Sequence, residues 1–339
     1  MNPSAQSLYE TAFFSEPLID LGDHNPAFRG ILMPSSEFGV AAVGITSQFL
    51  DSAETYHSKY TSDDRSKARQ AEYRDIFEWH GLPTGKPLAI LDIGAGSGGN
   101  TFIPLLNLFP GSTYVATDLS PNLLGILNGL YRASTLDCTL LCVCTDACRA
   151  PMRHETFDLV VGSSILHHLI DPRQALERVH AVLKPNGIAI FFEPFEKGHA
   201  VVALAFKQIL RQSREGRALD PRVQKVFSDM LLDWGVRSGR NKQADMYKRL
   251  DDKWLFTENY LNDMCVELGF DRISMLRRPV PGGKFVTFVE NVLMLHSSLP
   301  RSIMPDWAWA IVRDIDETLS PDLSAELHIE DWFSVRKMR

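Results

Sequence analysis

The sequence lacks the features of a membrane-spanning or nucleic-acid-binding protein. None of its 339 residues belongs to an apolar run approaching the roughly 20 residues that a membrane-spanning helix needs. It has no Lys/Arg-rich run, and its formal net charge of -7 disfavours a nucleic-acid partner. The N-terminus lacks a positively charged region followed by an apolar one. Without such a secretory signal, we expect a cytoplasmic protein with no stable membrane insertion.

Cysteine is also scarce, and four of the five cysteines are close together: Cys138, Cys142, Cys144 and Cys148. Their spacing does not match the usual zinc-binding pairs. Cys142 and Cys144 share one face of an apolar, strand-like run, and a buried free cysteine packs as a small hydrophobe. We therefore expect core packing; a thiolate metal or redox site is the alternative.

Short apolar runs alternate with helix-like segments in the middle of the chain. The predicted strands are residues 88–93, 113–119, 139–145, 157–163 and 188–193, and the predicted helices are 101–109, 121–133 and 172–183. Pro121 and Pro172 suit the first turn of a helix, behind the potential N-caps Ser120 and Asp171. This alternation predicts an α/β fold whose parallel sheet is covered on both faces.

The flanking regions predict additions to this core. Residues 52–60 and 66–80 look helical, within a mixed or helical N-terminal cap that we place at 1–86. The core spans 87–298 and contains a helical insertion at 195–255. Strands at 271–279 and 285–295 form a terminal antiparallel hairpin that completes a seven-stranded Rossmann-like sheet. The C-terminal extension, 299–339, is expected to hold one helix and an irregular tail.

The run Leu91–Asn100 breaks a predicted strand into glycines before a predicted helix. Gly94, Gly96 and Gly99 match G-x-G-x-x-G, which alone is weak evidence for a dinucleotide. Such a loop lets backbone approach a small ligand at the carboxyl edge of the sheet.

Carboxylates near the ends of the first three predicted strands make the glycine run more specific. These are Asp92, Asp118 and Asp146, and Asp118 follows Gly98 by 20 residues, which suits hydrogen bonds from ribose hydroxyls. A pyrophosphate favours helix amides without nearby anions, whereas a sulfonium and an ammonium favour carboxylates. The charge pattern therefore favours S-adenosylmethionine over NAD. Taken singly, Asp118 or Asp146 is equally well explained as a turn residue or helix cap.

Five segments in this order resemble the class I S-adenosylmethionine-dependent methyltransferases, in particular the small-molecule type of ubiquinone and menaquinone biosynthesis. The segments are residues 91–98, 115–120, 145–147, 157–169 and 183–187. The resemblance covers about residues 87 to 295, with 195–255 outside it. It implies S-adenosylmethionine as the cofactor.

The resemblance also implies roles for individual residues. Asp92 and the backbone of Gly94, Ala95 and Gly96 would hold the methionine moiety. Asp118 would bind the ribose, and Leu119 would pack on the adenine. Three further positions complete the pocket: Asp146 accepts from the adenine amino group, the Ala147 amide faces the ring, and Ser163 lies beside the sulfonium.

The catalytic residues are less specific in the sequence. His167 and His168 follow the fourth predicted strand, where a histidine of near-neutral pKa can act as a base. Glu193 is a comparable candidate, and the alternative for all three is packing or hydrogen bonding. Tyr60 shares a helical face with Tyr56 and is a candidate contact to the methionine carboxylate or the acceptor; anchoring of the cap is the alternative. We expect no metal.

The predicted function is methyl transfer to an O, C or N atom of a small hydrophobic or aromatic metabolite, such as those of secondary metabolism. A protein that keeps the pocket for a binding role or a reaction other than methyl transfer is the first alternative. An NAD(P)-dependent oxidoreductase using the same glycines is the second. The expected partner is the acceptor molecule, and we expect a monomer or homodimer. The insertion 195–255 is predicted to cover the acceptor pocket or to be a helical buttress.

Overall fold

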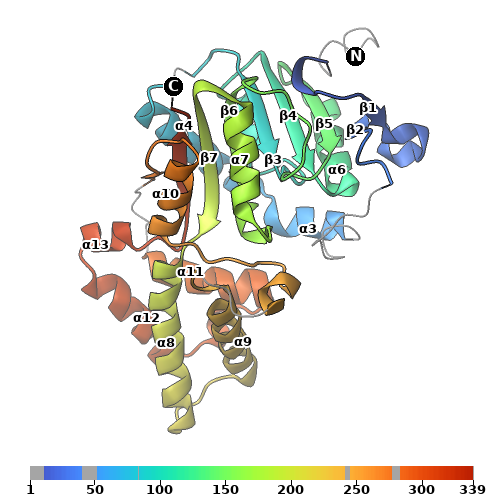
Figure 1. The fold of residues 1–339 in the computed structure, drawn as a ribbon. Helices are drawn as coiled ribbons and strands as arrows, with labels where there is room; N and C mark the ends of the chain where they lie inside the picture. The colour runs from blue at the N-terminus through green and yellow to red at the C-terminus, as the bar shows by residue number, and fades with distance from the viewer. Residues whose placement is uncertain (1–10, 40–51, 83, 241–244, 277–282, 339) are drawn as a thin grey trace. The chain divides into compact units, whose positions relative to one another are not determined.

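The computed structural model describes residues 11–39, 52–82, 84–240, 245–276 and 283–338 of the chain (Figure 1). It divides into two compact units. Unit 1 comprises residues 1–192, 262–274 and 332–339, and unit 2 comprises residues 193–261 and 275–331.

Unit 1 is built on a mostly parallel sheet, as the sequence predicts, but the sheet has nine strands in the described part of the chain where seven were expected. Their order is β1-β2-β5-β4-β3-β6-β7-β9-β8. The central strands β3 to β7 pair in parallel, and β1 runs antiparallel to β2 at one edge. Their bounds are β1 Leu18–Asp20, β2 Ile31–Pro34, β3 Ala89–Ile93, β4 Ser112–Asp118, β5 Cys138–Cys144, β6 Phe157–Ser163, β7 Leu183–Pro194, β8 Ser274–Met275 and β9 Glu330–Arg336. The ends of β7, β8 and β9 cross into unit 2.

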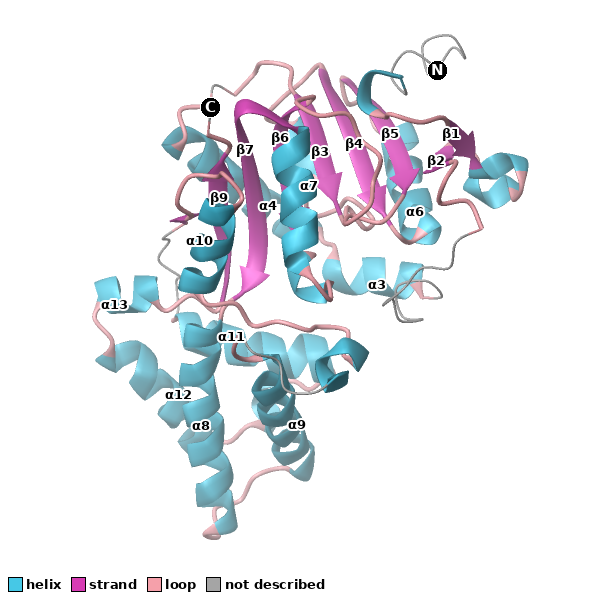
Figure 2. Ribbon diagram, viewed as in Figure 1, coloured by secondary structure: helices cyan, strands magenta, loops and turns pink. Residues whose placement is uncertain are grey.

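Helices lie on both faces of this sheet; Figure 2 shows α7 in front of it and α4 behind. The predicted caps are confirmed, since Ser120 accepts from the Leu123 amide and Asp171 from the Arg173 amide. The helices of unit 1 are α3 Ala53–Tyr60, α4 Asp63–Trp79, α5 Phe102–Leu106, α6 Pro121–Ala133, α7 Pro172–Val182 and most of α10 Glu258–Glu267. Apolar side chains of β3, β4 and β6 are almost fully buried, so the chemistry of unit 1 is confined to strand ends and loops.

The predicted terminal hairpin is wrong. β8 covers only Ser274–Met275 of the expected strand 271–279, of which residues 277–279 lie outside the described residues. The expected strand 285–295 is instead α11 Lys284–Asn291 followed by a π-helical turn, Val292–His296. Its buried residues recur at the spacing of one helical face, namely Phe285, Val286, Val289, Val292 and Leu293. A helical segment therefore separates β8 from β9.

The C-terminal prediction also needs correction. Two helices, α12 Asp306–Thr318 and α13 Pro321–Glu326, precede β9, where one helix and an irregular tail were expected. β9 lies next to β7 in the sheet, so the last residues complete unit 1. The buried indole of Trp332 donates to Glu72 of α4 at 2.7 Å, which ties β9 to the N-terminal region.

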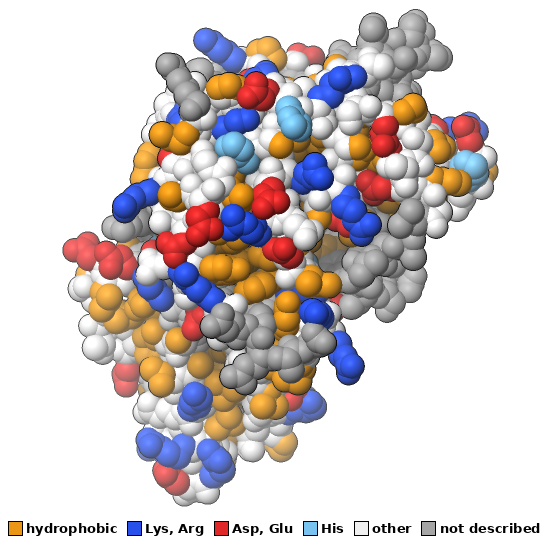
Figure 3. Space-filling model, in the orientation of Figure 1, with side chains coloured by type: hydrophobic (Ala, Val, Ile, Leu, Met, Phe, Trp, Pro, Cys, Tyr) orange, Lys and Arg blue, Asp and Glu red, His pale blue; other side chains and the backbone are white. Residues whose placement is uncertain are grey.

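Unit 2 is helical, as predicted for residues 195–255, and also includes α11, α12 and α13. Its two longest helices are α8 Glu196–Arg214 and α9 Pro221–Arg237. Phe206 stacks on Phe227 with ring centroids 3.8 Å apart, and Trp234 stacks on Phe206 at 5.5 Å. Figure 3 shows hydrophobic side chains on the surface of this part of the molecule, where Leu204 and Leu232 are strongly exposed. Among the described residues, no helix is long and apolar enough to cross a membrane.

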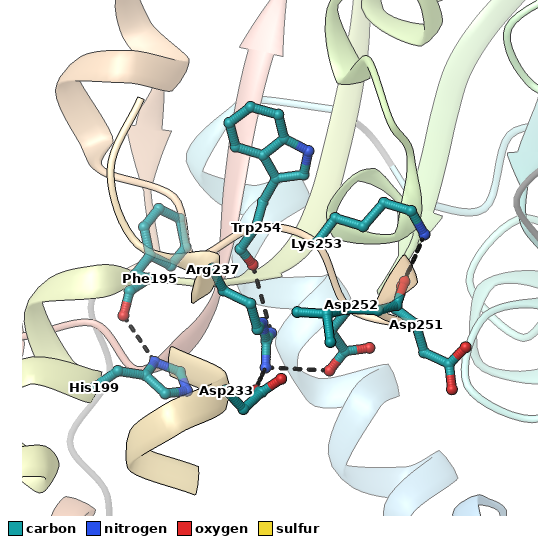
Figure 4. A network of polar contacts seen from close by, with 9 residues as sticks. Phe195, His199, Asp233, Arg237, Asp251, Asp252, Lys253 and Trp254 are labelled. Atoms are coloured by element: carbon teal, nitrogen blue, oxygen red, sulfur yellow. Dashed lines mark hydrogen bonds and ion pairs between the residues drawn. The ribbon is translucent and has the colours of Figure 1, made fainter. Parts of the chain in front are cut away.

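A polar network fixes the segment that follows α9 (Figure 4). The buried Arg237 guanidinium lies 2.9 Å from Asp233 and 3.3 Å from Asp252, and it donates to the Trp254 carbonyl at 3.4 Å. The buried Lys253 ammonium donates to the carbonyls of Leu250 and Asp251. The Arg237 contacts hold Asp252 and Trp254 to the end of α9, and the Lys253 bonds give its buried ammonium two acceptors.

Candidate cofactor site

The carboxyl ends of β3, β4 and β5 bring the predicted cofactor residues to one edge of the sheet. Parallel pairing aligns Ile93 with Thr117 and Asp118 with Cys144. The glycine loop, Asp118 and Asp146 therefore lie at or just after the ends of three neighbouring strands. This is where open α/β sheets bind ligands.

The glycine loop has the backbone conformation that its sequence suggests. Gly94, Gly96 and Gly98 all have positive φ angles, of 66°, 53° and 76°. A Cβ on Gly94 would meet Ile165 at 2.7 Å, and one on Gly98 would meet Leu127 at 2.2 Å, so packing requires glycine there. A Cβ on Gly96 would meet nothing within 4 Å. Gly96 therefore faces open space, as a residue whose backbone approaches a ligand should.

Asp92 lies deeper than a direct ligand contact would suggest. Its fully buried carboxylate accepts from the Thr101 hydroxyl and, at 2.6 Å, from the Tyr114 hydroxyl. Both bonds go to Oδ2, and Oδ1 is buried without a hydrogen-bond partner. Burial raises the pKa of Asp92 to about 7, the Asp118 charge adds to the increase, and the two hydrogen bonds oppose it. An ionised carboxylate here would be stabilised by a cationic ligand.

Asp118, the last residue of β4, joins the glycine loop to the turn after its own strand. Its Oδ2 accepts from the Gly96 amide and its Oδ1 from the Ser120 amide, both at 2.8 Å. Burial raises its pKa, against the effect of these backbone bonds. The side chain therefore orients Gly96, the glycine of the loop that faces open space. Leu119 follows it, and its carbonyl accepts from the Cys144 thiol.

Asp146 begins the turn after β5. Its carboxylate accepts from the Cys148 amide at 2.9 Å and pairs with Arg149 at 3.1 Å, and Ala147 lies between them in the turn. The Asp146 amide donates to Glu37, which also accepts from the Thr145 hydroxyl at 2.5 Å. Glu37 was not predicted as a site residue, because it belongs to an N-terminal region with no recognisable motif.

The fourth strand end carries a polar and aromatic loop. Ser163 is the last residue of β6, and Ser164 has a positive φ of 62°. His167 is buried and its ring centroid lies 4.2 Å from that of His168, in a 3-10 turn at Leu166–His168. Glu193 is fully buried near the end of β7 and is assigned to unit 2.

The short helix α3 contacts the glycine loop directly. His57 Nδ1 lies 2.8 Å from the Ser97 hydroxyl, and a Cβ on Gly99 would meet the Thr61 side chain at 2.2 Å. Tyr60, the last residue of α3, has its ring 4.7 Å from that of Tyr56. α3 thus lies against the loop through His57, and the role of Tyr60 toward the cofactor or the acceptor stays a prediction.

The clustered cysteines belong to the packing around β5. Cys142 and Cys144 are buried, and all five thiols are free. Burial raises the pKa of Cys142 and of Cys144 to about 12, so both are protonated thiols near neutral pH.

Residues 91–191 match the family model described as a methyltransferase domain. The matched segment contains the glycine loop and the ends of β4, β5 and β6. This segment is an S-adenosylmethionine-dependent methyltransferase domain. The predicted family, and S-adenosylmethionine as the cofactor of the methyltransferase domain, are thereby confirmed. The loop conformation and the open space at Gly96 fit that cofactor.

Individual relatives share between a quarter and about a third of their residues with this chain over the matched segments. A PKS-NRPS hybrid synthetase of Chaetomium globosum is 25% identical over 241 residues, which cover 68% of this chain and 5% of the synthetase. The mitochondrial arginine-hydroxylase NDUFAF5 of Homo sapiens is 34% identical over 109 residues, covering 32% of this chain and 29% of that protein. The chain thus spans a minor part of either relative. A crystal structure of the CurJ carbon methyltransferase has a TM-score of 0.48 and 15% identity, covering all of this chain and 72% of that one.

Proposed function

We propose that the chain transfers a methyl group from S-adenosylmethionine to an O, C or N atom of a small, hydrophobic or aromatic metabolite. The observation that carries this proposal is the arrangement of Gly96 and three aspartates at the ends of neighbouring strands. The Gly96 amide, at a positive-φ position that faces open space, is held by Asp118. Asp92 lies near the end of β3, and Asp146 lies just after β5. This arrangement provides acceptors for ribose and adenine and negative charge for a cationic donor.

Each residue has a proposed part in holding the donor. Asp118 would accept from the ribose hydroxyls, and Leu119 would pack on the base. Asp146 would accept a hydrogen bond from the adenine amino group, and the Ala147 amide would face the adenine ring. The methionine moiety would lie along the backbone of Gly94, Ala95 and Gly96, with the unpartnered oxygen of buried Asp92 favouring the ammonium. Ser163 and Tyr60 complete the proposed cofactor residues.

When bound, S-adenosylmethionine supplies a methyl group on a positively charged sulfur. The protein's contribution is to orient this group, exclude water and present the acceptor in line. Holding two reactants in such a geometry can supply on the order of 7–11 kcal/mol of barrier reduction. We propose His167, His168 and Glu193 as candidates for removing an acceptor proton, which an alcohol or carbon acid requires and a good nucleophile does not.

The acceptor class is supported by the name of the fungal relative. A PKS-NRPS hybrid synthetase makes polyketide and peptide products, and its matching segment covers most of this chain. We therefore propose a hydrophobic secondary metabolite as the acceptor. A cytoplasmic location, a monomeric or dimeric state and the division of the chain at residues 86 and 298 stay predictions.

The test uses the full chain with methyl-labelled S-adenosylmethionine and a small-molecule extract of the source cells. We expect label in an organic-extractable product and equimolar S-adenosylhomocysteine. The reaction should be slowed at limiting S-adenosylmethionine in Asp118→Ala. Binding of the cofactor without any labelled product would favour the alternative function.

That alternative is a protein that binds S-adenosylmethionine but performs another reaction or a binding role. One observation favours it: the human relative is named an arginine-hydroxylase although it is 34% identical to this chain over 109 residues. Pocket residues therefore specify the cofactor more strongly than the reaction. Product analysis distinguishes the two functions, since only methyl transfer yields stoichiometric S-adenosylhomocysteine.

A further inference from the structure

We propose that Glu37 is a positioning residue of the cofactor site, which acts through Asp146 and makes the site selective for a base bearing an amino group. This inference rests on the proposed function, because it assigns Asp146 to the adenine edge. It also gives a role to β1 and β2, which the methyltransferase match at residues 91–191 does not include.

The sheet extension explains how a residue so early in the chain reaches the site. β2 pairs in parallel with β5, with Ile31 opposite Cys142 and Leu32 opposite Val143. The residues after β2 therefore emerge at the same edge as those after β5. The Glu37 amide donates to the Pro34 carbonyl at 3.0 Å, forming a turn that keeps Glu37 near that edge. Glu16 supports the turn by accepting from the Ser36 amide and hydroxyl.

The contacts of Glu37 involve both of its carboxylate oxygens. Oε1 accepts from the Thr145 hydroxyl at 2.5 Å, and Oε2 accepts from the Asp146 amide at 3.1 Å. An ionised carboxylate is an acceptor only, so both donors are matched. The peptide between Thr145 and Asp146 is thereby held from outside the methyltransferase segment. The Asp146 carboxylate is in turn held by the Cys148 amide.

The negative charge of Glu37 adds to the hydrogen-bond acceptors at the end of β5. Burial raises the pKa of the nearby Cys144 thiol, and the charges of Asp118 and Glu37 contribute to the increase. Glu37 is thus electrostatically close to the end of β5. An edge rich in negative charge and acceptors favours a ligand that presents an N–H donor, and it disfavours a carbonyl at the same position. Adenine presents an amino group where hypoxanthine presents a carbonyl.

The experiment compares S-adenosylhomocysteine with S-inosylhomocysteine by calorimetric titration of the full chain. In Glu37→Gln, one oxygen remains to accept from the Asp146 amide, the Thr145 hydroxyl must rotate to accept from the new NH2, and the negative charge beside Asp146 is lost. We expect S-adenosylhomocysteine to bind about tenfold more weakly to this variant. Binding of S-inosylhomocysteine should change by less than about twofold, so the selectivity ratio should fall.

Asp20→Asn is the matched control, because the Asp20 carboxylate bonds to the Gly22 and Gly30 amides within the same sheet extension. It should lower the melting temperature of the chain and leave the selectivity ratio unchanged. Equal weakening of both ligands by Glu37→Gln, or an unchanged ratio, would overturn the inference while the wild-type affinity for S-adenosylhomocysteine still supports the proposed function. Failure of the wild type to bind S-adenosylhomocysteine would overturn both.

Discussion

Tyr114 of β4 donates its hydroxyl proton to Asp92 of β3 at 2.6 Å, inside the core of unit 1. The pairing links the strand that precedes the glycine loop to its neighbour. Thr101 donates to the same carboxyl group. Burial nevertheless raises the pKa of Asp92 to about 7. The folded protein therefore binds a proton near pH 6 that the unfolded chain has released.

This difference predicts how stability depends on pH. Because the pKa of Asp92 is higher in the folded state than its ordinary value of 3.8, its contribution is fully present below about pH 4 and is lost as the pH rises to 7. The loss amounts to at most about 4 kcal/mol. Asp92→Asn carries no charge and should remove this dependence, which denaturant unfolding between pH 4.5 and 8 would measure. The same slope in wild type and variant would contradict the assignment. Asp171→Asn, at a helix cap, should keep the wild-type slope.

Asp118→Ala should weaken binding of S-adenosylhomocysteine by about 1–3 kcal/mol, because it removes charge-assisted acceptors and releases the Gly96 amide. Asp171→Ala is its control. Both carboxylates accept from the amide two residues later, but Asp171 lies at the start of α7. Calorimetry on both variants should show lost affinity in the first alone. Unchanged affinity in Asp118→Ala would refute its role.

Gly96→Ala should abolish cofactor binding, since the alanine Cβ would occupy the open space in which the cofactor is proposed to contact the protein backbone. Positive φ also strains any alanine, at a cost of about 1–2 kcal/mol. Gly85→Ala controls for strain, because Gly85 has a φ of 85° and no atom within 4 Å of a Cβ. Both variants should lose similar stability in thermal melts. If Gly96→Ala binds S-adenosylhomocysteine as well as Gly85→Ala does, the loop is not the binding surface.

Arg237→Ala should destabilise the protein by about 2–3 kcal/mol, below the full cost of breaking a buried pair because Asp233 and Asp252 are partly exposed. Lys225→Ala is a control on the same helix: its pair with Asp229 has the same four-residue spacing but is exposed. It should change the free energy of unfolding by less than about 0.5 kcal/mol. Chemical denaturation that shows equal effects would contradict the importance of the network in Figure 4.

The central strands were predictable because their apolar runs are short and buried on both faces. β6 Phe157–Ser163 and α6 Pro121–Ala133 have the predicted bounds, the latter aided by its Ser120 cap and proline. Residues 285–295 were predicted as a strand because β-branched and aromatic side chains are typical of strands. Their burial at helical spacing is decided by packing in unit 2.

The candidate site was predictable where its residues lie in short motifs. Asp118 ends β4 and Gly96 follows β3, and their contact comes from the parallel pairing of these two strands. Glu37 and His57 were not predictable, since each reaches the site by tertiary contact over long sequence separation. The orientation of Asp92 toward Tyr114 likewise depends on the register of β3 and β4.

The most direct test of this account is a calorimetric titration of the full chain with S-adenosylhomocysteine and, separately, with NADH. We predict saturable one-to-one binding of S-adenosylhomocysteine, weakened in Asp118→Ala and absent in Gly96→Ala, and no heat of binding with NADH. Binding of NADH without binding of S-adenosylhomocysteine would contradict the account and favour an oxidoreductase.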